Sequence, residues 1–164
     1  MENQTLAKTD DNELEPEESS SDFKVFILKM CAFHNWKVQQ ADNEHAVLEF
    51  AAGNERSQTL FIFGFDNEME FSIPSFAAFD SMENVPHYIS TSLLQINAKT
   101  KIGFWCLEQI GDKLVYTYMQ NASISNLTEE LFKEIVVAII QRVDEFENLL
   151  MKMSGEGNSV TDPS

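Results

Sequence analysis

Residues 103–118 read GFWCLEQIGDKLVYTY, which is two apolar runs separated by Gly111 and Asp112. Glycine at the first central position of a two-residue connection is typical of a type II′ turn, whose twist suits an antiparallel hairpin. The turn fixes the register, and the hairpin spans about 102–120. The predicted pairs are Ile110 with Lys113, Gln109 with Leu114, Leu107 with Tyr116, Trp105 with Tyr118, and Phe104 with Met119.

This register divides the hairpin into two faces, because successive side chains of a strand point to opposite sides of the sheet. One face holds Trp105, Leu107, Leu114, Tyr116 and Tyr118. The other holds Ile102, Phe104, Cys106, Val115, Thr117 and Met119. Both faces are rich in apolar groups, so a partner must cover one of them unless a helix of this chain crosses over to do so.

Tryptophan and tyrosine carry polar tips and are enriched at protein interfaces. We therefore assign the Trp105 face to contact with a partner or a second copy of the chain, and the Cys106 face to the core. The alternative is that the helix before the hairpin covers the second face.

Upstream of the hairpin, apolar residues at spacings of three and four predict a helix over about 22–34. Four strand-like runs with turn residues between them follow this helix. The run LFIFGF at 60–65 is apolar on nearly every residue, which favours a central strand covered on both faces. Pro74 lacks an N–H group and indicates that the fourth strand is short or lies at an edge by that point.

A second helix is expected over about 85–98, and a long amphipathic helix runs from about 126 to 153, with Ser125 and Asn126 as capping candidates. The order is therefore helix, four strands, helix, two strands, helix. Tight connections between neighbouring strands favour an α+β fold with a mainly antiparallel sheet and its helices packed on one face. We expect a single domain over 21–153, with a disordered acidic tail at 1–20 and a disordered tail at 154–164.

The formal net charge of −16, from 27 acidic and 11 basic residues, argues against nucleic acid and anionic membranes as partners. The start of the chain has no basic segment followed by an apolar one, and the apolar runs are too short to span a membrane. We therefore expect a cytoplasmic protein.

The sequence offers no recognisable catalytic or cofactor motif. Neither of the glycine-rich phosphate-binding patterns occurs. The histidines His34, His45 and His87 form no metal-binding or catalytic spacing, and Cys31 and Cys106 are expected to be buried free thiols. We expect no catalytic residue, no metal and no cofactor.

Segments 93–120 and 126–150 contain a helix end, a glycine-turn hairpin and a long closing helix. The residues that carry this pattern are Leu93, Leu94, Asn97, Gly103, Trp105, Gly111, Leu114, Val115, Leu127 and Glu130. The chain resembles the YbjN-like proteins and, behind them, the type III secretion chaperone-like superfamily, over about 22–152.

The resemblance implies a helix–strand domain that commonly dimerises and holds another protein chain, without catalytic residues. We therefore expect a non-enzymatic interaction module of chaperone-like or regulatory type that binds a protein or peptide as a homodimer. The alternative is a small-ligand-binding or enzymatic domain with a cleft between the 85–98 helix and the 102–120 hairpin.

Overall fold

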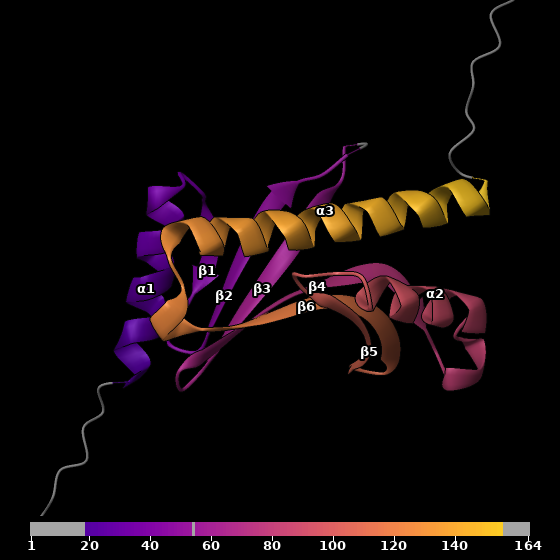
Figure 1. Cartoon of the computed structure of the whole chain (residues 1–164), viewed down its shortest axis with the longest axis horizontal. Helices are drawn as coiled ribbons and strands as arrows, with labels where there is room; N and C mark the ends of the chain where they lie inside the picture. The colour runs from indigo at the N-terminus through magenta and orange to yellow at the C-terminus, as the bar shows by residue number, and fades with distance from the viewer. Residues whose placement is uncertain (1–18, 54, 156–164) are drawn as a thin grey trace, which may run out of the picture.

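A computed structural model describes residues 19–53 and 55–155, and most of both expected tails lies outside these ranges (Figure 1). Three helices and six strands follow the predicted order. The elements are α1 (Ser19–Phe33), β1 (Val38–Ala41), β2 (His45–Ala51), β3 (Ser57–Phe65), β4 (Glu68–Phe79), α2 (His87–Asn97), β5 (Phe104–Ile110), β6 (Lys113–Ser123) and α3 (Glu129–Ser154). Short 3-10 turns lie at Met82–Asn84 and Ile124–Asn126.

The six strands form one antiparallel sheet in the order β1-β2-β3-β4-β6-β5. Neighbouring strands in the first half are also neighbours in sequence, since short turns join them. The exception is the pairing of β6 with β4, which skips β5 and leaves it at the edge of the sheet. The α+β fold class is therefore confirmed.

The hairpin register is confirmed for all five predicted pairs, from Ile110 with Lys113 to Phe104 with Met119. Gly111 has a positive φ of 62°, and Asp112 is not among the described residues with positive φ. That combination is the one a type II′ turn requires.

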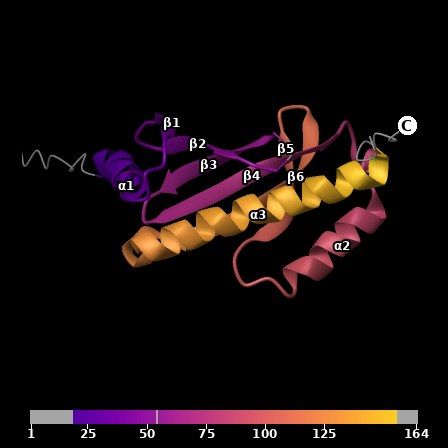
Figure 2. The same cartoon turned by 90° about the horizontal axis from the view of Figure 1, so that it is seen from above.

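All three helices contribute to one core with the same face of the sheet, as the two views show (Figures 1 and 2). Helix α3 lies across the sheet, with α1 near its beginning and α2 beside its C-terminal half. Its buried side chains recur at helical spacing: Phe132, Ile135, Val136, Ile139, Val143, Phe146 and Glu147. Thr128 caps this helix by accepting a hydrogen bond from the Leu131 N–H, whereas the expected caps Ser125 and Asn126 lie in the preceding 3-10 turn.

The prediction that 60–65 is covered on both faces is wrong. Leu60 and Ile62 are fully buried beneath the helices, but Phe61 and Phe63 point to the opposite face and are only half-buried. We call this opposite side of the sheet the uncovered face. The continuous apolar run in this strand therefore supplies one buried face and one partly exposed face.

Strand β4 is the longest of the sheet, so the first alternative, a short strand, is wrong, whereas the second, an edge position by Pro74, is confirmed. Its pairing with β3 ends at Ser72, so Pro74 is paired only with β6, opposite Thr117. A register shift follows between Pro74 and Ala78. The missing N–H of Pro74 thus falls where β4 has already separated from β3.

Candidate functional site

The five residues predicted to face a partner lie on the helix-covered side of the sheet. Trp105, Tyr116 and Tyr118 are buried, and Tyr118 has no exposed surface at all. Leu107 and Leu114 are half-buried. The assignment of the two hairpin faces is therefore reversed in the structure: the Trp105 face belongs to the core, and the Cys106 face lies on the opposite side of the sheet, where Val115 and Thr117 are nevertheless buried.

The polar tips of these aromatic residues are satisfied inside the chain, which explains how they can be buried. The Tyr118 hydroxyl donates a hydrogen bond to the Ile102 carbonyl at 2.6 Å, and the Tyr116 hydroxyl is 2.6 Å from the Ser90 hydroxyl of α2. The Trp105 ring packs on Phe146 of α3, with ring centroids 4.6 Å apart. Helices α2 and α3 thus cover the Trp105 face of the hairpin, and α2 is the helix before the hairpin that the alternative interpretation of the sequence proposed as a cover.

Helix α2 is fastened to β5 through Asn97. The Asn97 side chain accepts a hydrogen bond from the Trp105 N–H at 2.7 Å and donates one to the Trp105 carbonyl at 2.9 Å. Among the described residues of α2, only Leu93 is buried. Few buried contacts therefore attach α2 to the rest of the protein, and much of its surface is exposed to solvent.

A groove of about 410 Å³ lies between α2 and the C-terminal half of α3, and we call it the α2–α3 groove. It is lined by Tyr88, Ile89, Ser92, Leu93, Ile96, Trp105, Arg142, Glu145, Phe146, Leu149, Leu150 and Met153. Its walls are mostly apolar, and its two charged side chains, Arg142 and Glu145, pair with each other at 3.0 Å. The groove coincides in part with the expected cleft beside the hairpin, but α3 supplies one wall and the hairpin contributes Trp105.

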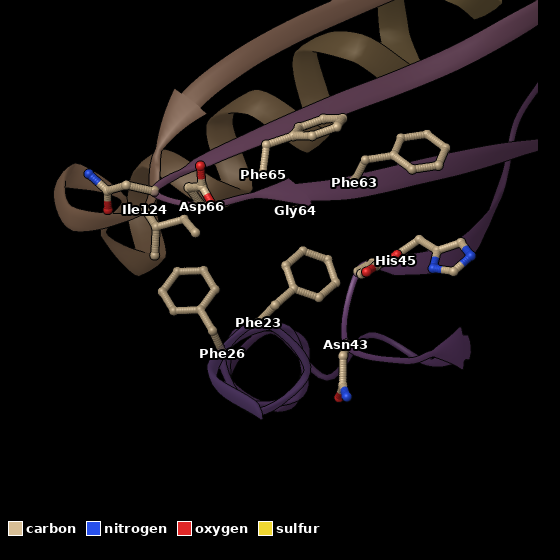
Figure 3. A pocket seen from close by; sticks show the side chains of 11 residues that line it. Phe23, Phe26, Asn43, His45, Phe63, Gly64, Phe65, Asp66 and Ile124 are labelled. Atoms are coloured by element: carbon tan, nitrogen blue, oxygen red, sulfur yellow. The ribbon is translucent and has the colours of Figure 1, made fainter. Parts of the chain in front are cut away.

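A second, larger groove of about 820 Å³ lies at the other end of the sheet (Figure 3). Phe23 and Phe26 of α1 lie on the Gly64 side of β3, whereas the Phe63 and Phe65 rings, which also line the groove, point away from α1. Gly64 allows this close approach, because a Cβ atom there would lie 2.6 Å from the Phe23 ring. The groove is open and aromatic, with polar groups at its margin.

The histidines lie apart in the fold, and the side chains of His34 and His45 have structural partners. His34 Nε2 is 2.8 Å from the Glu129 carbonyl, His45 Nδ1 is 2.5 Å from Asp42 in a turn, and His87 begins α2. Within residues 19–53 and 55–155, no group of three metal-ligating side chains comes together. None of the described helices is long and apolar enough to cross a membrane.

The two cysteines are free; Cys31 is buried, as expected, whereas Cys106 is half-buried on the uncovered face. Burial raises the pKa of each thiol to about 11, and for Cys106 the nearby carboxylates of Glu108 and Glu70 add to this effect. Both side chains are therefore neutral thiols at physiological pH, and a neutral thiol is a poor nucleophile.

We expect alkylation of both cysteines by iodoacetamide to be slow in the folded protein, because only about one thiol in a thousand is ionised at about pH 8. The rate should rise roughly tenfold per pH unit up to about pH 10. Mass spectrometry of the labelled protein measures both sites, with the urea-unfolded chain as the fast-reacting control. Rapid alkylation of folded Cys106 near pH 8 would contradict the raised pKa.

The protein belongs to the α+β fold class, with a six-stranded antiparallel sheet and three helices on one face. No family model and no curated protein matches the sequence. Among solved structures, the fold is similar to the crystal structure of YbjN from E. coli, a proposed transcription regulator, with a TM-score of 0.51 and 16% sequence identity. The similarity covers 73% of this chain and 84% of that one. A YbjN-like fold is therefore confirmed, while the type III secretion chaperone resemblance stays a prediction.

Proposed function

We propose that this protein is a non-enzymatic interaction module of chaperone-like or regulatory type, which binds a protein or peptide partner. The observation that carries the proposal is the α2–α3 groove, whose walls leave large apolar side chains in contact with solvent. Exposed apolar patches of this kind mark interaction sites in folded proteins. The fold similarity to YbjN, a proposed transcription regulator, supports a regulatory role.

The chemistry of the groove supports a non-enzymatic role. Its two charged residues, Arg142 and Glu145, neutralise each other, and neither cysteine lines it. A catalytic site needs titratable groups that converge on a substrate. Our proposal accordingly includes no cofactor, nucleic acid or membrane partner, and it places the protein in the cytoplasm.

A small apolar ligand is the second candidate, because a volume of about 410 Å³ lies within the range of small-molecule sites. Such a ligand would occupy the groove alone, whereas a polypeptide would also contact the exposed side chains on the outer surfaces of α2 and α3.

The proposed interaction module can be tested by affinity capture of partners from the native cell, with the full chain as bait. The wild type is compared with the Leu149→Ser variant. Leu149 lines the groove and is exposed, so its replacement should not unfold the protein. We expect the wild type to retain a polypeptide in stoichiometric amount. Recovery of a small apolar compound in place of a polypeptide would favour the second candidate.

We also propose that the protein works as a homodimer. Light scattering coupled to size-exclusion chromatography should then give twice the chain mass at micromolar concentration. Trp105→Ala is unsuitable for locating the interface, because Trp105 is a core residue and its loss would disturb folding. A mass equal to one chain at all concentrations would remove the dimer from the proposal.

A further inference from the structure

Exposed apolar side chains gather around the α2–α3 groove. Five large ones on these two helices have exposed fractions between 41% and 67%: Tyr88, Leu94, Ile96, Leu149 and Met153. Four of the five line the groove itself. A helix that buries little and exposes this much apolar surface has room for a further packing partner.

The shape of the groove fits a helix. Two helices, α2 and the C-terminal half of α3, form its walls, and Figures 1 and 2 both show them side by side. Side chains of a third helix can enter the space between two such ridges, as in helical bundles and in helix-in-groove recognition. An amphipathic helix would present its apolar residues at spacings of three and four.

The charge on the α2 side of the groove differs in sign from that of the whole chain, while on the α3 wall Glu145 is paired with Arg142. Residues 87–101, which contain α2, include no acidic residue, although the net charge of the protein is −16. Lys99 and Lys101 follow α2, and Lys152 lies beside Met153 at the end of α3; all three are exposed. None of the ion pairs in the described part of the chain includes any of these lysines.

The charge pattern indicates what occupies the groove. In a symmetric dimer the same patch is present on both subunits, so groove-to-groove contact would bring these lysines toward each other. A partner with carboxylates flanking its apolar stripe would instead neutralise them. Acidic residues are therefore expected on the bound segment.

We propose that the α2–α3 groove binds an acidic amphipathic helix of a partner protein. Its apolar stripe packs against Ile96, Leu149 and Met153, and its carboxylates face Lys99, Lys101 and Lys152. This inference rests on the proposed function and adds to it the chemistry of the partner.

Two synthetic peptides of about 18 residues, or five helical turns, test the inference. Both carry leucines at positions i, i+3, i+4 and i+7, and the remaining surface is glutamate-rich in one and lysine-rich in the other. The net charge of −16 favours the lysine-rich peptide, whereas the local pattern favours the glutamate-rich one. Fluorescence anisotropy should show at least roughly tenfold tighter binding of the glutamate-rich peptide at about 50 mM salt, weakening at higher salt.

Variants assign this binding to the groove. Leu149→Ser should weaken it about tenfold through lost apolar contact, and Lys99→Gln combined with Lys101→Gln should weaken it about threefold. Val25→Ser on α1 is the matched control, because Val25 is also exposed, at 65% against 55% for Leu149, but lies on a different helix. Each variant's thermal midpoint should match that of the wild type.

Tighter binding of the lysine-rich peptide, or equal binding to Leu149→Ser, would overturn the inference. Dimerisation that Leu149→Ser abolishes would also overturn it, since a second copy would then occupy the groove. If affinity capture still retains a polypeptide in any of these cases, the interaction module stands and only the assigned partner chemistry fails.

Discussion

Replacing Glu147 with alanine is expected to lower the free energy of unfolding by about 3–5 kcal/mol. Glu147 is 5% exposed and sits between α3 and the sheet. Its carboxylate accepts hydrogen bonds from Arg56 at 2.6 Å, from the Gln58 amide at 2.6 Å and from the Phe76 N–H at 2.9 Å. The variant would leave the buried Gln58 amide and a backbone N–H without an acceptor, which costs more than the lost ion pair itself.

In this variant Arg56 would still be paired with Asp144. The loss of stability therefore arises mainly from the two neutral donors, the Gln58 amide and the Phe76 N–H. The matched control is Glu145→Ala on the same helix, because Glu145 forms an exposed ion pair with Arg142. Its removal should cost less than about 1 kcal/mol. Urea unfolding followed by tryptophan fluorescence measures both variants, and similar midpoints for the two would show that the Glu147 network adds little.

Replacing Gly103 with alanine is expected to be similarly damaging, for a steric reason. Gly103 has a φ of 77°, and its Cβ would lie 2.8 Å from Cζ of the Tyr118 ring and 3.0 Å from the Met119 carbonyl oxygen. The ring cannot move aside freely, because its hydroxyl is bonded to the Ile102 carbonyl. We expect about 1–3 kcal/mol from the left-handed backbone and a further cost of about 1–3 kcal/mol from the overlap.

Gly111→Ala separates these two contributions. Gly111 also has a positive φ, but a Cβ atom there would have no neighbour within 4 Å. The control should therefore show only the backbone cost. Urea denaturation of both variants gives the difference, and equal losses would mean that the Tyr118 ring adapts to the added methyl group.

Features set by local chemistry could be predicted from the sequence. The turn at Gly111 and Asp112 fixed the hairpin register, and amphipathic spacing located the long closing helix. Helix caps were less predictable, because Ser125, Asn126 and Thr128 are all good capping residues and only tertiary placement selects Thr128.

The orientation of the hairpin could not be predicted, because both of its faces are apolar. Which face meets the helices depends on how β6 pairs with β4, and that pairing joins residues that are 35 to 55 positions apart in sequence. The hydroxyls of Tyr116 and Tyr118 suggested solvent, yet Ser90 and the Ile102 carbonyl satisfy them inside the protein. The α2–α3 groove was predicted only in part for the same reason, since α3 supplies a wall that lies far from α2 in sequence.

The Asn97 contact limits how this sheet could be extended by another strand. Alternate residues of an edge strand direct their N–H and C=O groups outward, and in β5 those residues are Trp105, Leu107 and Gln109. Asn97 already occupies both outward groups of Trp105. An added strand could therefore pair only with Leu107 and Gln109, and the Trp105 end of β5 is closed to it. Association of two molecules along β5 must accordingly depend more on side-chain contacts than on backbone pairing.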